Sequence, residues 1–229
     1  KEHRSLSLYM WFYVPIPKTF RSIFKDGFES GDALAWTRVD GNPAVVADPV
    51  NSGSYALRCN AAERVDKDRL SGTDVVFVRG YFRLSANPPN GKNVVVLRAY
   101  DNASREIYLV QFNCILRKSD HILRIQLTRQ FPSSVSTNYV YNYSADTWYS
   151  IEVKFYRNAT SGEYRVYLDG SEIITDTSLN TTECGQLDRI RVGQVSSTYP
   201  VTVYIDDVVV DEEYIGPLSA NNTPTMNST

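Results

Sequence analysis

The chain is poor in the residues that transition-metal sites and histidine-based catalysis require. Its 229 residues include only two histidines and three cysteines. Cys59, Cys114 and Cys184 lack the C-x-x-C spacing of zinc and redox sites, so they form either one disulfide with a thiol left over or three separate thiols. No apolar run approaches the ~18–20 residues of a transmembrane helix, which predicts no membrane span.

An excess of charge of either sign is also missing. The chain has 24 Lys and Arg against 26 Asp and Glu, a formal net charge of -2. This balance gives no global attraction to nucleic acid, so we expect no nucleic-acid partner. The length fits a single domain, since β-sandwiches of ~200–250 residues are often one domain.

The chain is rich in strand signals. Apolar and polar residues alternate in runs bounded by Gly, Pro, Asn and Asp, and no long window has the helical period. The pair Asp169-Gly170 predicts a tight hairpin, because such a turn needs positive φ. We therefore predict an all-β, antiparallel β-sandwich. The clearest strand runs are 75–85, 93–100, 105–113, 121–129, 147–157, 162–173, 187–193 and 200–211.

Three segments carry a resemblance to a known family. They are FKDGFESGDALAWT at 24–37 with GSYALR at 53–58, DTWYSIEVKFYRNATSGEYRVYLDGSEI at 146–173, and IRVGQ at 190–194 leading to VYIDDVVVD at 203–211. Their order and spacing resemble the concanavalin A-like lectin/glucanase superfamily, in its laminin-G-like jelly-roll branch. The resemblance implies a jelly roll. It leaves function open, because the superfamily includes lectins, carbohydrate-binding modules, glycan hydrolases, lyases and structural modules.

The domain organisation follows from these patterns. We predict an N-terminal extension over 1–23 that contains an extended strand, a jelly-roll β-sandwich over 24–217, and a polar tail over 218–229.

Catalytic motifs are missing. Glucanases of the superfamily carry a Glu-x-Asp-x-Glu strand, and glycosidic cleavage needs two carboxyl groups flanking the bond. The nearest acidic cluster, at 206–213, is interrupted by three valines, and His121 reads as a surface or turn residue. The chain has no GxSxG elbow, P-loop or HExxH motif. We expect that the protein is not an enzyme.

The resemblance also implies a structural calcium ion where the first and last strands of the jelly roll meet. Calcium prefers carboxylate and carbonyl oxygens, and both segments are rich in Asp and Glu. The alternative is a solvated acidic edge that discourages edge-to-edge aggregation. The candidate ligands are Asp26, Glu29, Asp32, Asp206, Asp207 and Asp211.

Three of the strand runs place Arg, Tyr and Gln opposite their apolar residues. If these strands are neighbours in one sheet, they form a band suited to acidic glycans, because aromatic rings stack on sugars and Arg pairs with carboxylate or sulfate. This predicts a secreted lectin-like module as one function. The alternative is an ordinary solvated outer face. The candidates are Arg79, Tyr81, Arg83, Arg98, Tyr100, Arg124 and Gln126.

Six N-x-S/T sequons indicate a secreted glycoprotein at an extracellular or cell-surface location. The alternative is that turns of a β-protein are rich in Asn, Ser and Thr. The predicted N-glycosylation sites are Asn102, Asn142, Asn158, Asn180, Asn221 and Asn227.

The segment SLSLYMWFYVPIP at 5–17 alternates over eleven positions and ends in two prolines, which stop sheet pairing. Large apolar side chains in such a strand need a partner surface. Our main prediction is donation of this strand to a neighbouring subunit, which gives a head-to-tail homopolymer in an extracellular filament or surface layer. The alternatives are an edge strand of the chain's own sandwich and a trimmed targeting segment. The apolar positions are Leu6, Leu8, Met10, Phe12, Val14 and Ile16.

Overall fold

The computed structural model describes residues 22–117, 120–195 and 200–218, without the side chains of 115–121. The predicted assembly strand at 5–17 lies outside the described residues, as do the sequons at Asn221 and Asn227. Within the described ranges, no helix is long and apolar enough to cross a membrane.

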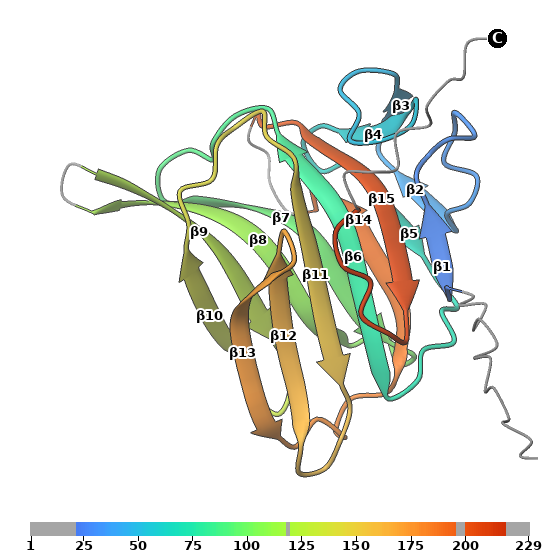
Figure 1. Cartoon of the computed structure of the whole chain (residues 1–229), viewed down its shortest axis with the longest axis vertical. Helices are drawn as coiled ribbons and strands as arrows, with labels where there is room; N and C mark the ends of the chain where they lie inside the picture. The colour runs from blue at the N-terminus through green and yellow to red at the C-terminus, as the bar shows by residue number, and fades with distance from the viewer. Residues whose placement is uncertain (1–21, 118–119, 196–199, 219–229) are drawn as a thin grey trace, which may run out of the picture.

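Two antiparallel sheets face each other (Figure 1). Sheet A has the order β13-β12-β11-β6-β15-β4-β3, and β1 pairs with the end of β15 that β4 leaves open. Its strands are β1 (Phe24–Asp26), β3 (Ala44–Val46), β4 (Ala56–Cys59), β6 (Val75–Leu84), β11 (Tyr149–Tyr156), β12 (Gly162–Leu168), β13 (Ser171–Leu179) and β15 (Val203–Asp211).

Sheet B has the order β10-β9-β8-β7-β14-β5-β2. The β8–β9 hairpin is longer than its neighbours and projects from the sandwich (Figure 1), because β7 pairs with β8 only as far as Cys114. The strands are β2 (Arg38–Asp40), β5 (Arg64–Lys67), β7 (Lys92–Asp101), β8 (Glu106–Arg117), β9 (Asp120–Arg129), β10 (Val135–Val140) and β14 (Leu187–Gly193).

The predicted all-β antiparallel sandwich is confirmed. Each of the eight predicted runs overlaps a strand of the structure, and the run at 162–173 contains β12 and the start of β13. Asp169 and Gly170, in the turn between them, have φ values of 49° and 85°, as a tight hairpin requires. Six short or weakly alternating strands, β1, β2, β3, β4, β5 and β10, lie outside the predicted strand runs.

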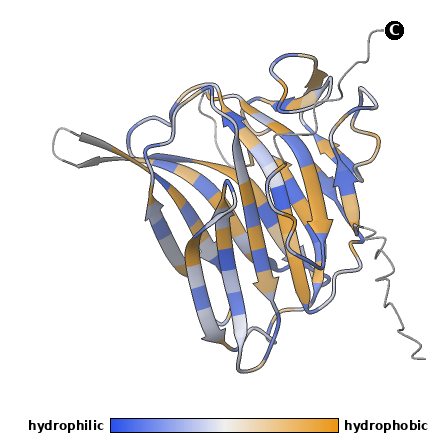
Figure 2. Ribbon diagram, viewed as in Figure 1, coloured by the Kyte–Doolittle hydropathy of each residue, from blue (hydrophilic) through white to orange (hydrophobic). Residues whose placement is uncertain are grey.

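The core lies between the sheets, where one face of each long strand is apolar. Along β6, Val76, Val78, Phe82 and Leu84 are fully or almost fully buried, and hydrophobic and hydrophilic residues alternate along the strands (Figure 2). This burial of one face is what the period-2 pattern of a sandwich strand provides.

The first family segment forms an aromatic cluster at the edge of the core. Trp36 stacks on Phe28 at 6.0 Å between ring centroids and meets Phe24 edge-on at 5.1 Å. Its indole Nε1–H donates a hydrogen bond of 2.7 Å to the carboxylate of Asp26. The tryptophan thereby ties β1 to the loop that precedes β2.

The three cysteines are separate buried thiols, which selects one of the two alternatives that the sequence left open. Burial raises the pKa of the Cys59 thiol far above its usual value, so this group stays protonated and unreactive.

After β15 the chain turns back and crosses the outer face of sheet A (Figure 1). We call this segment, residues 212–218, the strap. The buried carboxylate of Glu152 accepts hydrogen bonds of 2.8 Å from two consecutive strap N–H groups. The hydroxyl of Tyr81 accepts another, of 2.7 Å, from the N–H of Leu218. The strap therefore seals the middle of this face.

Candidate functional site

The seven predicted glycan-binding residues do not form one band, because their strands belong to different sheets. Strand β6 is in sheet A, whereas β7 and β9 are in sheet B. Arg79, Tyr81 and Arg83 therefore lie on one outer face of the sandwich. The remaining four lie on the opposite outer face: Arg98, Tyr100, Arg124 and Gln126.

On sheet A the three candidates are already engaged. Arg79 and Tyr81 lie beneath the strap and are 5% and 8% exposed. Arg83 forms an ion pair of 2.9 Å with Asp146 and lies over the ring of Tyr204. This face offers little free surface to a sugar.

On sheet B, Tyr100 lies under two arginines. The guanidinium carbons of Arg189 and Arg191 are 4.1 Å and 5.4 Å from the centroid of its ring. Arg191 in turn binds both carboxylate oxygens of Asp66, at 2.7 Å and 2.8 Å, and these hydrogen bonds raise the pKa of its guanidinium. One face of the tyrosine is therefore covered by protein and closed to a sugar ring.

Arginine–carboxylate pairs cover the outer face of β2, β5, β14 and the adjoining part of β7. We call this region the ionic half of the outer face. Each outward arginine there has a carboxylate within 4 Å, so the charges cancel and the side chains hold one another. The pairs are Arg38–Asp66 at 3.4 Å, Arg64–Asp40 at 2.9 Å, Arg98–Glu106 at 3.1 Å, Arg189–Asp68 at 3.9 Å and Arg191–Asp66 at 2.7 Å.

The other half of this face carries uncharged amides. Asn93, Gln111, Gln126 and Asn138 project from β7, β8, β9 and β10, and a chain of hydrogen bonds joins them into what we call the amide row. The Asn93 amide N–H donates to Gln111 Oε1 at 2.7 Å, Gln111 donates to Gln126, and Gln126 donates to Asn138 Oδ1 at 2.6 Å. Asn113 also donates to Gln126, at 3.3 Å.

This amide half is hollowed. Gln111, Asn113 and Gln126 point outward from the sheet, yet they are only 7%, 6% and 9% exposed. A depression of about 380 Å³ opens over them, which is within the ~300–1,000 Å³ of small-molecule sites. It is lined by Gly91, Lys92, Asn93, Gln111, Asn113, Cys114, Arg124 and Gln126.

The arrangement suits a ligand that both donates and accepts hydrogen bonds. An amide side chain has two N–H donors and two acceptor lone pairs, and the amide row uses only part of this capacity. Two predicted residues, Arg124 and Gln126, line the depression. Gln111, Asn113 and Asn138 were not among the predicted residues, although Asn and Gln at outward positions of consecutive strands are a signal that the sequence contains.

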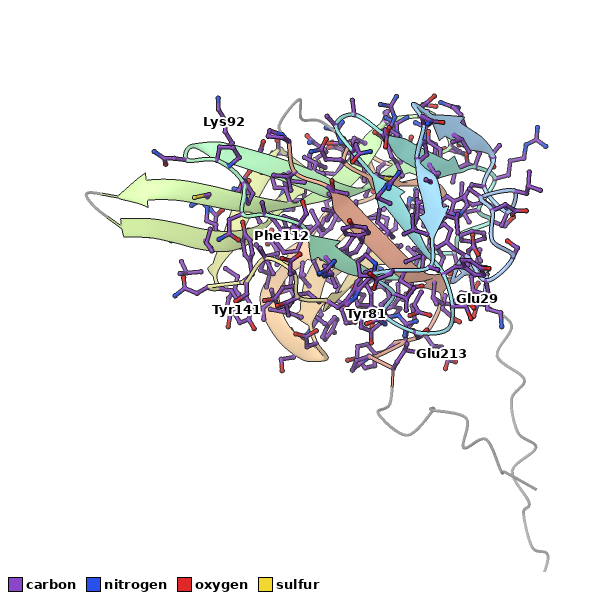
Figure 3. All side chains as sticks on the ribbon, turned by 90° about the horizontal axis from the view of Figure 1, so that it is seen from above. Glu29, Tyr81, Lys92, Phe112, Tyr141 and Glu213 are labelled. Carbon is purple, nitrogen blue, oxygen red and sulfur yellow. The ribbon has the colours of Figure 1, made fainter. Side chains whose placement is uncertain are left out.

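The predicted calcium ligands lie elsewhere, where β1 pairs with β15 as the resemblance implied. Figure 3 shows Glu29 far from Lys92, a residue of the depression. A Cβ atom placed on Gly27 would lie 3.5 Å from Asp207 Oδ1 and 3.8 Å from Asp206 Oδ1. The carboxylates of the last strand therefore lie close to the first segment at Gly27.

Each of these carboxylates nevertheless has its own donors. Glu29 accepts hydrogen bonds of 2.9–3.1 Å from the N–H groups of Ser54 and Tyr55. Asp206 accepts from the N–H groups of Asn51 and Ser52 at 2.9 Å and 3.2 Å. Asp207 accepts from the side chains of the same two residues, at 2.9 Å from Asn51 Nδ2 and 3.0 Å from Ser52 Oγ. Burial, together with the charge of the neighbouring carboxylate, raises the pKa of Asp206 to about 7.

The other three candidates bond locally. Asp26 accepts the hydrogen bond from the indole N–H of Trp36. Asp32 accepts a hydrogen bond from the N–H of Leu34 at 3.1 Å. Asp211 accepts hydrogen bonds from the N–H groups of the two residues that follow it. No three Asp, Glu, His or Cys side chains in the described ranges converge so as to hold a metal. The oxygen donors fit calcium in kind, but backbone carbonyls and water would have to complete its coordination.

Four sequons fall on described residues. Asn102, Asn142 and Asn180 are exposed, whereas Asn158 is half-buried and donates to the hydroxyl of Tyr156 at 2.9 Å. Asn102 follows β7 at the end of the sandwich opposite Lys92, and the chain around Asn158 and Asn180 is joined there by a hydrogen bond of 2.9 Å. Glycans at Asn102, Asn158 and Asn180 would therefore leave the amide half open.

The chain matches no protein-family profile and no curated protein sequence. Solved structures do match. The binding domain of botulinum neurotoxin serotype G has a TM-score of 0.57 and 14% identity over 86% of this chain and 49% of that one. A sialidase has a TM-score of 0.55 and 16% identity over 86% of this chain and 19% of that one.

The chain has the concanavalin A-like lectin/glucanase fold. A third structure of this fold, the binding domain of botulinum neurotoxin DC in complex with SialylT, has a TM-score of 0.53 and 14% identity over 78% of this chain. The chain spans less than half the length of the three chains it matches here. At these identities the likeness establishes the concanavalin A-like fold, and activity is a separate question.

Proposed function

We propose that the chain is a lectin-like, carbohydrate-binding domain of an extracellular or cell-surface protein, and that it holds an oligosaccharide against the amide half of sheet B. The observation that carries this proposal is the amide row, which crosses four neighbouring strands and whose members Asn93, Gln111 and Gln126 line a depression. Sugar hydroxyls both donate and accept hydrogen bonds, and amide side chains match both roles.

The structural neighbours support the same class of ligand. One neurotoxin binding domain was solved with SialylT, and the cell entry of botulinum neurotoxin type C is described as dependent on interaction with two ganglioside molecules. These are properties of those proteins. They favour sugar binding over strand-mediated assembly as the first proposal for this chain.

Binding without cleavage is the form of the proposal that fits the site. The described residues around the depression are amides, glycine, cysteine, lysine and arginine, without a carboxyl group. Hydrolysis of a glycosidic bond by the usual route needs two carboxyl groups flanking the bond.

A glycan array followed by calorimetry tests the proposal. Asn138→Ala removes the exposed end of the amide row, and Gln111→Ala removes a central member. We expect each variant to weaken sugar binding roughly 5- to 10-fold, the effect of one neutral hydrogen bond. Gln186→Ala, an exposed amide near the opposite end of β7, is the matched control and keeps full affinity. Failure of the wild-type protein to bind any glycan contradicts the proposal.

Assembly by strand donation is a second proposal, carried by the alternation of residues 5–17. That segment lies outside the described residues, so its support is the sequence pattern alone.

A further inference from the structure

We infer that Arg124 makes the amide half selective for an anionic sugar by binding its carboxylate or sulfate group. This inference rests on the proposed function and names the ligand class of the same site. The observation behind it is a contrast among the outward arginines of sheet B.

Five of these arginines are neutralised by the protein itself, since each has a carboxylate within 4 Å. Arg124 differs from all five. It has no ion pair with any residue that the structure describes. Its Nε–H is also shielded from solvent without a hydrogen-bond partner, as are those of Arg64, Arg98 and Arg189. A shielded polar group that lacks a partner in the free protein gains most from a ligand that supplies one.

Among the residues whose side chains are described, no carboxylate lies beside Arg124. In register, it lies between Asn113 on β8 and Val140 on β10. The lining of the depression adds a second cation, Lys92, at its exposed rim (Figure 3), and the described lining residues include no Asp or Glu. Within the described lining, the charged side chains are therefore cations, on a chain whose net charge is -2.

The position favours a directed contact over long-range attraction. A guanidinium offers its N–H groups in a planar fork that matches two oxygens of one anion. Partial shielding by the neighbouring amides weakens the screening that an exposed charge would suffer from salt. The amides then remain available for the hydroxyl groups of the same sugar. One anionic sugar therefore binds to the guanidinium and to the amides at the same time.

Carboxylate and sulfate share this chemistry, and matched ligands separate them. Binding constants are measured by calorimetry for a neutral oligosaccharide and for forms of it that carry a sialic acid, a uronic acid or a sulfate. The proteins are the wild type, Arg124→Ala, Arg124→Lys and Arg83→Ala. Arg83 is an outward arginine of sheet A and serves as the matched control.

We expect wild-type protein to bind at least one anionic form more tightly than the neutral form. Arg124→Ala should lose about 10- to 100-fold for that anionic form, the effect of a hydrogen bond to a charged group, and keep its affinity for the neutral form. Arg124→Lys should keep part of the anion preference, since it retains the charge without the fork. Arg83→Ala should behave as wild type.

The outcomes separate the two claims. If wild-type protein binds the neutral and anionic forms equally, or if Arg124→Ala keeps the full anion preference, the inference is wrong and the carbohydrate-binding function stands. If wild-type protein binds no sugar of the panel, both claims fail. An unchanged melting temperature of Arg124→Ala excludes misfolding as the cause of a loss.

Discussion

Arg79 and Glu152 stand opposite each other on β6 and β11, and both bind the same strap residue, Gly216. The carboxylate of Glu152 accepts the Gly216 N–H at 2.8 Å, and Nη1 of Arg79 donates to the Gly216 carbonyl at 2.8 Å. The two side chains are only 5% and 2% exposed. The strap therefore rests on a buried pair of opposite charges.

We predict that Glu152→Ala is strongly destabilising. The substitution leaves the Arg79 guanidinium buried without its counter-charge and leaves two strap N–H groups unpaired, which together cost about 3–5 kcal/mol. Denaturant unfolding measures the loss. The control is Glu172→Ala, an exposed carboxylate on the same sheet, for which we expect a change of about 1 kcal/mol or less. Equal stabilities of the two variants would contradict the role of the buried pair.

Asp101 predicts a dependence of stability on pH. Burial alone would raise the pKa of this carboxyl, but hydrogen bonds from Gly185 and Arg105 and the charge of Arg105 outweigh it, and the pKa is lowered in the folded protein. A lowered pKa stabilises the fold above the unfolded value of about 3.9, and this contribution is lost as the pH falls through the folded value.

Asp101→Asn should therefore cost about 2–4 kcal/mol at pH 7, and its difference from wild type should shrink below about pH 4. Stability measured between pH 7 and pH 3 checks both points. The exposed carboxylate of Asp146 supplies the control, Asp146→Asn, with a change within about 0.5 kcal/mol. A difference that stays constant with pH would refute the assignment.

Calcium binding at the junction of β1 and β15 is tested by thermal melting. If the ion binds, calcium at 100 times its Kd stabilises the fold by about 2.7 kcal/mol. This corresponds to a rise in Tm of about 5–10 °C for a chain of this length. Asp206→Ala should abolish the rise. Magnesium serves as the control ion, and a Tm that responds to neither calcium nor chelator removes the proposal.

Deletion of residues 1–17 tests strand donation. We expect the full chain to form polymers and the deleted chain to remain a soluble monomer, because the strand that enters the neighbouring subunit is gone. Fusing the SLSLYMWFYVPIP segment back should restore assembly. Sedimentation of the full chain as a monomer at high concentration would contradict donation.

The sequence predicted the strands well, because alternation is a local property that each run displays by itself. It could not predict which strands share a sheet. Arg83 and Arg124 occupy equivalent outward positions in their runs, yet long-range pairing places them on opposite faces of the sandwich. The strap was not predicted either, since residues 212–218 have neither the helical nor the strand period.

The strap also determines on which face of the sandwich the described chain ends. Its last residue, Leu218, donates its N–H to Tyr81 on sheet A, whereas the amide half faces outward from sheet B. Figure 3 shows Tyr81 and Lys92 on opposite sides of the molecule. The described chain therefore ends on the face of the sandwich opposite the amide half. If the amide half binds a glycan as we propose, that glycan approaches the face that lies away from this exit.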